Sequence, residues 1–283
     1  MKIRAFVDGS IYSQSVCDHA AWAAGRLQAE LQLMHVLGRR EAASVPSDLS
    51  GALALGARTT LLQELSELDE QRSKLAQKRG RAILEDAAGM AHLGGADKVT
   101  TKLRHGDVLE TLEALEAETD MFVIGKRGEA ADFAKLHLGS NLERVVRAAT
   151  RPVFVASRAF KPIQKVLVAF DGSVNSLKAV DAMSRSTLYA GLQIKLLMVG
   201  DRSAENEKRI EDARATLSGG SITAEAEIVE GHVEAVIAER VEQEGINLLV
   251  MGTHGHSRIR SLIIGSTTTE MLRSCKIPVM LYR

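Results

Sequence analysis

A glycine-rich segment close to the C-terminus holds residue types that suit an anionic ligand. It follows the pattern Gly252-x2-Gly255-x9-Gly265-Ser266, with two His and two Arg among its glycines. Glycine removes side-chain bulk, so its backbone can come close to another group. The amides of a helix beginning after Gly265 would point outward with the positive end of the helix dipole, which suits a phosphate. The segment therefore predicts phosphate binding.

An Asp-Gly-Ser tripeptide follows two apolar runs, one at Asp8 and one at Asp171. The carboxylate could accept a hydrogen bond from a ribose hydroxyl or a base amino group, although the same tripeptide is also good turn chemistry. A helix terminus contributes only about 0.3–2 kcal/mol, whereas micromolar binding needs about 8 kcal/mol. A pocket for a base and its ribose must therefore supply most of the affinity, with Asp171 as the expected acceptor.

The composition restricts the function classes. The 283 residues include 36 Lys plus Arg and 36 Asp plus Glu, which disfavours nucleic acid and anionic membrane as partners. No apolar run reaches the roughly 18 residues that span a bilayer, and the N-terminus lacks a signal-peptide core. The two cysteines, Cys17 and Cys275, are expected to be reduced thiols. We expect a cytoplasmic protein.

The chain repeats itself. AFVDGS (5–10) returns as VAFDGS (168–173), and TRPVFVA (150–156) matches KIPVMLY (276–282). The offset between the copies falls from 163 to about 126 residues, so the first copy carries an insertion of about 37 residues within Gly38–Asp97. The sequence predicts a first domain at 1–157, a linker at 158–164 and a second domain at 165–283.

Within each copy, short apolar runs alternate with helical patterns. Runs that are apolar throughout are typical of parallel strands covered on both faces. The insertion includes a long amphipathic helix at 59–93, preceded by a segment at 38–56 that we expect to be a mobile loop. For the second copy we predict strands at Lys165–Phe170, Gln193–Val199, Ile222–Val229, Leu248–Met251 and Pro278–Tyr282, and helices at 174–188, 203–217, 232–243 and 266–274. The fold class is α/β, with two tandem doubly wound domains.

With the glycine loop after a strand in both copies, the chain resembles the universal stress protein family in its tandem two-domain form. The resemblance implies a Rossmann-like, five-stranded parallel sheet in each domain, in the order 3-2-1-4-5. It also implies ATP or AMP as ligand, with Mg²⁺ accompanying ATP. The last strands of the two domains would pair antiparallel. Carried over to the second copy, the nucleotide-binding residues would be Asp171, Val199, Met251, Gly252, His254, Gly255, Gly265, Ser266 and Thr267.

The first copy departs from the family pattern, because its loop is Gly125-x2-Gly128-x10-Gly139-Ser140, one residue longer. We therefore favour the second copy as the nucleotide site. Whether the insertion covers the crevice of the first copy as a lid is left open by the sequence. The loop of the first copy has positive charge from Lys126, Arg127, Lys135 and His137. A second nucleotide site would consist of Asp8, Val36, Ile124, Gly125, Gly128, Gly139, Ser140 and Asn141.

Simpler explanations accompany these hypotheses. The segments that begin at Ser140 and Thr267 match helix capping boxes, and His35, on an apolar strand, is expected to be a hydrogen-bonded core histidine. His254 and His256 lack a third metal ligand. No catalytic or metal residue is predicted, and any ATP hydrolysis should be slow, since a P-loop lysine is missing. We expect the protein to act by binding an adenine nucleotide, by self-association and through an unidentified protein partner. The alternatives are a nucleotide-independent dimeric scaffold and a slow ATPase.

Overall fold

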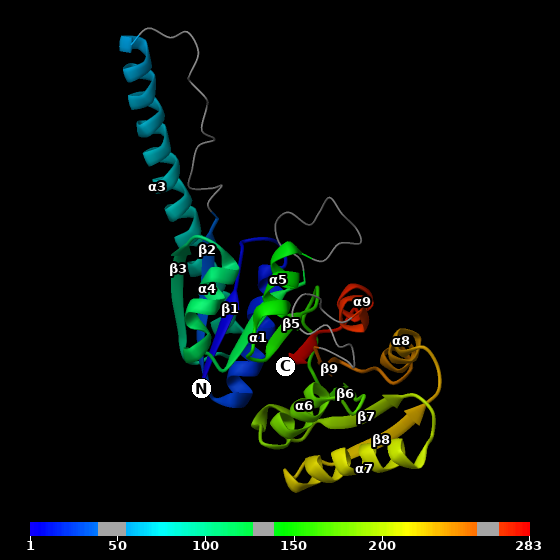
Figure 1. The fold of residues 1–283 in the computed structure, drawn as a ribbon. Coiled ribbons are helices and arrows are strands. Elements are labelled where there is room, and N and C mark those ends of the chain that lie inside the picture. Colours follow the sequence, from blue (N-terminus) through cyan, green and yellow to red (C-terminus); the bar gives the residue numbers. More distant parts are fainter. Residues whose placement is uncertain (39–54, 127–138, 254–265) are drawn as a thin grey trace.

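The computed structural model describes residues 1–38, 55–126, 139–253 and 266–283, and it forms one continuous sheet (Figure 1). Its ten strands lie in the order β3-β2-β1-β4-β5-β10-β9-β6-β7-β8. Strands are parallel within each half, and the halves join where β5 and β10 pair antiparallel, with Met280 opposite Phe154. Each half therefore has the strand order 3-2-1-4-5 that the family resemblance implied.

The elements follow one another in the same order in both halves. In the first half the strands are β1 (Lys2–Phe6), β2 (Glu30–Leu37), β3 (Val99–His105), β4 (Met121–Gly125) and β5 (Val153–Ala156), and the helices are α1 (Ser13–Leu27), α3 (Leu55–Leu93), α4 (Val108–Leu115), η1 (Glu116–Glu118) and α5 (Ser140–Ala148). In the second half the strands are β6 (Lys165–Ala169), β7 (Gln193–Val199), β8 (Ala224–Val229), β9 (Leu248–Gly252) and β10 (Val279–Tyr282), and the helices are α6 (Val174–Ser184), η3 (Thr187–Tyr189), α7 (Ala204–Gly219), α8 (Val233–Gln243) and α9 (Ser266–Ser274).

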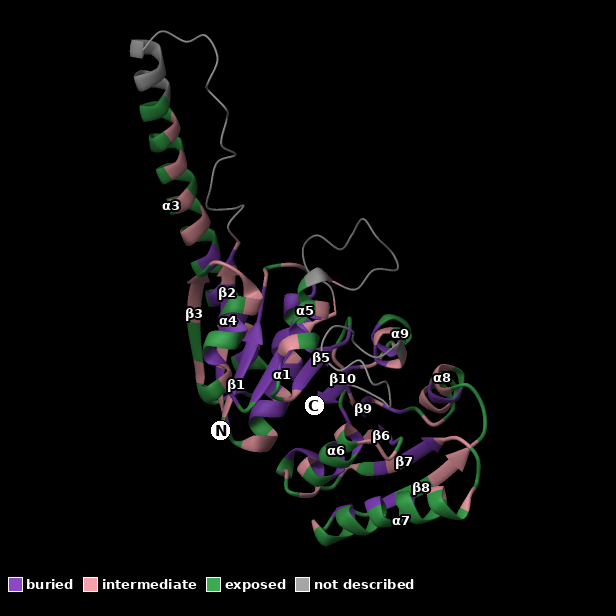
Figure 2. Cartoon of the chain, viewed as in Figure 1, coloured by how far each residue is buried: buried purple, intermediate pink, exposed green. Residues whose placement is uncertain are grey.

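Helices cover both faces of the sheet, so most strand residues are buried (Figure 2). One apolar cluster joins the sheet to α1, α3, α6 and α7, through residues such as Val16, Leu84 and Ile210. The other cluster joins the opposite face to α4, α5, α8 and α9, through residues such as Leu112 and Met271. Both clusters run across the two halves, and such burial is the main favourable term in folding.

The predicted elements of the second half agree closely with those observed, with one helix as an exception. The strand predicted at Gln193–Val199 has those bounds, whereas the helix predicted at 174–188 ends at Ser184 and is followed by the short 3-10 helix η3. The side chain of Ser186 caps η3 by accepting a hydrogen bond from the Leu188 amide, so the chain breaks there. The long insertion helix is present as α3. The loop predicted at 38–56 falls almost entirely outside the described residues.

Cationic side chains from each half cap the last helix of the other. Lys126 Nζ, just after β4, donates to the carbonyl oxygens of Cys275 and, at 3.1 Å, Ile277 beyond the end of α9. Arg283 at the C-terminus donates to the carbonyl of Arg147 at 2.5 Å, in the last turn of α5. The sequence had placed Lys126 among the cations of the first glycine loop. That expectation is wrong, because the side chain turns into the seam, where burial lowers its pKa.

None of the described helices is long and apolar enough to cross a bilayer.

Candidate functional site

Parallel pairing brings the predicted residues of the second half to one end of the sheet. In the register, Ala169 of β6 lies beside both Leu197 of β7 and Met251 of β9. Asp171, Val199 and Gly252 therefore stand together at the carboxyl ends of three adjacent strands. This end of a doubly wound sheet, where the strand order reverses, is the usual place for a ligand.

Asp171 forms the turn that its sequence predicts and still exposes its side chain. The Oδ1 atom accepts a hydrogen bond from the Ser173 amide at 3.0 Å. Ser173 then caps α6 by accepting from the Ser176 amide at 3.3 Å. The second carboxylate oxygen has no hydrogen-bond partner within the described part of the chain, and Asp171 is exposed. This carboxylate can thus serve the turn and accept from a ligand at once.

Arg209 of α7 lies over this turn. A Cβ built on Gly172, whose φ is +70°, would lie 3.2 Å from Arg209 Cδ and 3.6 Å from its Nη1. The guanidinium pairs with Glu205 at 2.5 Å, and the side chain of Arg209 is 43% exposed. A cation therefore stands beside the predicted acceptor at the open end of the sheet.

Position 252 has no room for a side chain, because atoms at the start of α6 lie close to the backbone of Gly252. A Cβ at Gly252 would lie 2.9 Å from both the carbonyl carbon and the Cβ of Asn175, and 2.9 Å from the Ser176 amide nitrogen. The first turn of α6 thus crosses the end of β9 at a separation that excludes any other residue type. The family resemblance had implied that this glycine is one of the nucleotide-binding residues. Its observed contact is with α6, which holds the Asp171 turn against β9.

The start of α9 is tied to the same strand end. Thr268 is buried, and its Oγ1 donates to the carbonyl oxygen of Thr253 at 3.1 Å. The helix begins at Ser266, so Thr267 lies half-buried in the first turn and is not the cap that the sequence suggested. Met251 is buried and Val199 half-buried. Three predicted residues lie outside the described chain: His254, Gly255 and Gly265.

The first half repeats this arrangement with an apolar residue above the turn. Asp8 Oδ1 accepts from the Ser10 amide at 3.0 Å and from Ser13 Oγ at 3.2 Å, so the turn interpretation is confirmed here too. Gly9 has a φ of +77°, and a Cβ there would lie 2.7 Å from Cδ1 of Ile83, on α3. The insertion helix therefore packs directly onto the turn that would hold a nucleotide.

The other predicted residues of the first half occupy equivalent places. Val36 ends β2 as its penultimate residue, and Ile124 and Gly125 end β4. Helix α5 already includes Ser140 and its N-cap residue is Gly139, so the capping box predicted to begin at Ser140 is wrong. The structure places Ser140 as the first helical residue and Asn141 exposed in the first turn, and Gly128 lies outside the described residues.

His35 has the structural role that the sequence suggests. It is 7% exposed, and its Nδ1 lies 2.8 Å from the carbonyl oxygen of Val7. A buried ring with a backbone partner is a satisfied core group.

Sequence reasoning missed Arg209 and Ile83 as residues of these sites. The two occupy the same place in their halves, since 83 plus the offset of 126 that follows the insertion gives 209. This offset could have identified the two residues from the sequence. Ile83 and Arg209 align with each other once the offset of the later strands is applied to the helices before them.

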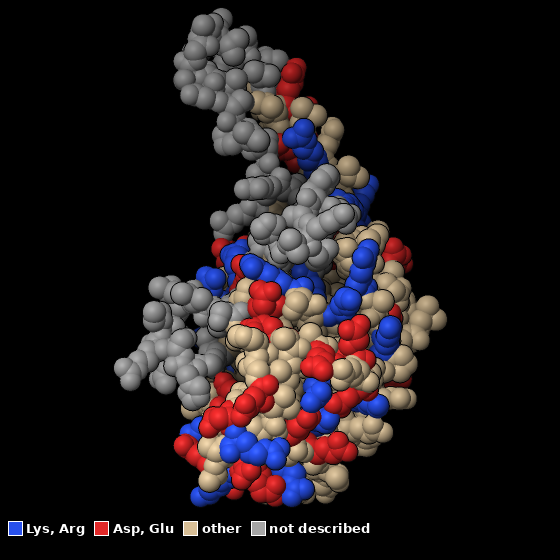
Figure 3. All heavy atoms as spheres, turned by 90° about the vertical axis from the view of Figure 1, so that its right-hand side faces the viewer, with Lys and Arg blue, Asp and Glu red and all other residues tan. Residues whose placement is uncertain are grey.

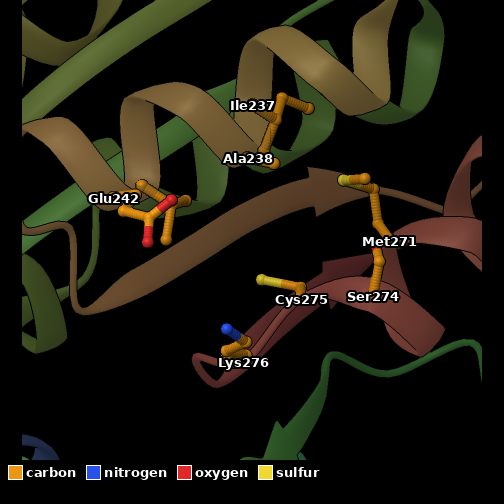
Figure 4. A pocket seen from close by; sticks show the side chains of 8 residues that line it. Ile237, Ala238, Glu242, Met271, Ser274, Cys275 and Lys276 are labelled. Atoms are coloured by element: carbon orange, nitrogen blue, oxygen red, sulfur yellow. The ribbon is translucent and has the colours of Figure 1, made fainter.

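A cavity of about 160 Å³ opens between α8 and α9 in the second half (Figure 4). Its lining comes from the later turns of both helices and the residues that follow α9: Ile237, Ala238, Val241, Glu242, Met271, Ser274, Cys275 and Lys276. Helices of a parallel sheet begin at the carboxyl ends of its strands, so this cavity lies at the opposite end from Asp171. Ligand pockets usually measure about 300–1,000 Å³, so the cavity is too small for a nucleotide.

The surface charge is mixed. Basic and acidic side chains alternate over the visible face of the body, without a large region of one sign (Figure 3). In the described ranges, no group of three or more His, Cys, Asp or Glu side chains could hold a metal ion.

The comparisons with known proteins agree with this architecture. The sequence profile of the universal stress protein family matches residues 1–157 and 190–283. A universal stress protein of Synechocystis is 36% identical over 279 residues, which cover 98% of this chain and 97% of the relative. A crystal structure of a universal stress protein from Archaeoglobus fulgidus superposes with a TM-score of 0.75 at 17% identity, covering 100% of this chain and 98% of that one. A putative universal stress protein from Pseudomonas aeruginosa gives 0.62 at 18% identity, covering 99% and 92%.

Proposed function

The chain belongs to the universal stress protein family, and from this premise we propose that its second half binds an adenine nucleotide, ATP or AMP. The nucleotide would lie at the carboxyl ends of β6, β7 and β9. Asp171 would accept from the ribose or the base, and the amides at the start of α9 would face the phosphates. Mg²⁺ would accompany ATP.

The observation that carries this proposal is the convergence of an exposed carboxylate and a cation at one strand end. Asp171 keeps an oxygen for a ligand, and Arg209 stands over the adjacent glycine. Hydrogen bonds to a charged group contribute about 1.5–3 kcal/mol each. Together with a helix terminus and stacking of the base against a half-buried strand end such as Val199, these contributions can reach micromolar affinity.

The first half is a weaker candidate for the same ligand. Ile83 fills the space above Gly9, and two protein donors already bind Oδ1 of Asp8. An apolar side chain over the turn offers a phosphate neither charge nor a hydrogen bond. We therefore propose one nucleotide per chain.

Nucleotide binding would act as a signal without turnover. A ligand bound at this strand end would change the surface offered to a protein partner, to the extent that it binds two conformations of the chain with different affinity. A scaffold role for the first half is the second candidate. The continuous sheet supports it, because β5 and β10 make each chain a built-in pseudo-dimer.

Two measurements on the purified protein test the proposal. A mass spectrum first identifies small molecules released on denaturation, and calorimetry then measures the binding of ATP. We expect one site of micromolar affinity, weakened at least tenfold by Asp171→Ala and little changed by the matched variant Asp8→Ala. The proposal fails if no adenine nucleotide binds or co-purifies. Equal losses in both variants would instead require two sites.

A turnover assay separates binding from slow hydrolysis. Phosphate release that falls in Asp171→Ala would make the protein an ATPase. Release that is equal in the wild type and the variant would come from a contaminant and would leave the binding role intact.

A further inference from the structure

Helix α3 extends far beyond the domain on which it packs (Figure 1). Among the helix residues whose burial the structure describes, from Leu62 onward, the first buried one is Gly80, where a Cβ would lie 2.6 Å from Cδ1 of Leu103 and 3.1 Å from Cδ2 of His35. Residues 62–79, here called the arm, precede this anchor. At 1.5 Å per residue the arm is about 27 Å long, and it stands clear of the body in a second view as well (Figure 3).

The arm carries leucines in a heptad pattern. Leu68 is 49% exposed and Leu75 is 68% exposed, and the half-buried Leu65 completes the spacing of three and seven residues on one helix face. Arg72 and Arg79 fill the remaining positions of this face. Such a stripe is the seam by which helices pair, and exposed apolar stripes mark interaction sites.

Acidic and basic side chains are segregated along the arm and the first two residues that follow it. Residues 62–70 hold four acidic side chains and no basic one, and residues 71–81 hold five basic side chains and no acidic one. Within one arm, Glu70 and Lys74 form a pair at the border, with 2.6 Å between them. A parallel partner of the same sequence would set acid against acid. An antiparallel partner would set each acidic half against a basic half.

We propose that the arm pairs antiparallel with the arm of a second copy of this chain. In this register, centred on Glu70, Leu65 lies opposite Leu75 of the second copy, and Leu68 meets the apolar stem of Arg72 of the second copy. Glu64 and Lys78 occupy the same flanking position of two heptads, and such positions face each other in an antiparallel pair, so each would face its opposite charge. The partner is fixed by the self-complementary sequence and requires no nucleotide.

The arm is long enough for a reversible contact. Isolated helices of this length are marginal in water, but the packing of Leu84, Ala87 and Ala91 against the body holds the arm helical before it pairs. Preorganisation lowers the cost of association. We expect association in the micromolar range that weakens at high salt, since the flanking charges are exposed.

Sedimentation velocity of the full-length protein over a wide concentration range tests the pairing. The wild type should form dimers. A mainly basic arm (Glu64→Lys, Glu67→Lys and Asp69→Lys) and a mainly acidic arm (Arg72→Glu, Lys78→Glu and Arg79→Glu) should each weaken dimerisation at least tenfold. An equimolar mixture of the two should recover it. Circular dichroism verifies that both variants fold. A monomeric wild type, or unchanged dimerisation of both variants, overturns the proposal.

Cross-linking tests the orientation. In a Cys275→Ser background, where the remaining Cys17 is buried, we place cysteines at either end of the arm. Glu64→Cys and Lys78→Cys should not link when alone, but their mixture should link with a short bismaleimide. Linking of each variant alone, without linking in the mixture, would mean parallel arms and would refute the proposal.

Discussion

The two halves share a fold and a turn, but they place different side chains above that turn. In the first half Ile83 of the 39-residue helix α3 lies over Gly9, and in the second half Arg209 of the 16-residue helix α7 lies over Gly172. Asp8 is half-buried with two donors on one oxygen, whereas Asp171 is exposed with one. The first repeat therefore has an apolar side chain over its turn, and the second repeat has a charged one.

The two halves differ less in their scaffold than in the residues above the turn. The strand order and the Asp-Gly-Ser turn recur in both halves. The residue above the turn is free to vary, since it touches the turn from a separate helix. In the first half this helix is longer and contacts the turn through an apolar side chain, and the proposed pairing of two chains uses its extension.

The largest effect is expected where a strand end and a helix meet most closely. Gly252→Val should abolish ATP binding to the second half and lower the free energy of unfolding by about 3 kcal/mol, because a side chain there must displace the backbone of Asn175 and Ser176. Urea denaturation and calorimetry measure the two effects. Gly219→Ala, with no atom within 4 Å of its added Cβ, should leave both unchanged or raise stability slightly. Full ATP binding by Gly252→Val would contradict the assigned geometry.

The next largest effect is expected at acid pH, where the first half should lose stability. His19 of α1 packs against Phe154 and Phe160, and burial lowers its pKa to about 4. The unfolded chain takes up this proton near pH 6.5, so stability of the first half should be full above that pH and fall as the pH drops toward 4. The loss is roughly 3 kcal/mol at most.

Trp22, the single tryptophan, lies beside Phe154 and reports on unfolding of the first half. Its fluorescence in urea, measured across this pH range, should show the decline in the wild type. His19→Gln cannot titrate and should show a flatter profile. Equal slopes for the two proteins would remove His19 as the cause.

Loss of the cation above the second turn should have a smaller effect. Arg209→Ile gives the second half the apolar type of residue found in the first, and it should weaken ATP binding about tenfold through a lost charge-assisted hydrogen bond. Stability should hardly change, because the exposed pair with Glu205 contributes little. Arg214→Ile, on the same helix and also paired to a glutamate, is the matched control. Equal affinity in both variants would separate Arg209 from the site.

The smallest effect concerns two helix caps at equivalent positions. Asp107 caps α4 by accepting from the Leu109 amide at 2.8 Å and pairs with Arg144, whereas His232 precedes α8 without a cap hydrogen bond. Asp107→Ala should cost about 1 kcal/mol, and His232→Asp should gain up to about 1 kcal/mol. Thermal unfolding monitored by circular dichroism measures both changes, and a stabilising Asp107→Ala would contradict the capping role.

The hydrogen bonds from Arg144 hold the pKa of Asp107 below its usual value. The stabilisation by Asp107 is therefore present above about pH 4 and is lost as the pH falls through the lower folded pKa. The stability difference between the wild type and Asp107→Ala should shrink in the same direction.

Much of the fold could be predicted, because strands buried on both faces are apolar throughout. The strand at Gln193–Val199 and the helix at 266–274 have the bounds that their patterns indicate. The internal repeat predicted the two-domain organisation, and the glycine pattern indicated the family. The helix predicted at 174–188 extended too far, because local patterns do not reveal that Ser186 caps a new turn.

The candidate site could be predicted only in part. Strand order brings Asp171 to the end of β9, so that placement follows from the fold class. The contacts of Gly252 with α6, of Ile83 with Gly9 and of Lys126 with the carbonyl of Ile277 depend on how helices and strands from distant sequence meet. The pattern of residue types along the chain does not reveal which residues of distant helices and strands come into contact.

The antiparallel junction of β5 with β10 determines on which sides of the sheet the two Asp-Gly-Ser turns lie. Since every other neighbouring pair in the sheet is parallel, the turn that begins at Asp8 and the turn that begins at Asp171 open on opposite long sides of one ribbon. If a nucleotide binds beside Asp171 as proposed, it would therefore leave the opposite side, with the Asp8 turn, accessible to a macromolecule.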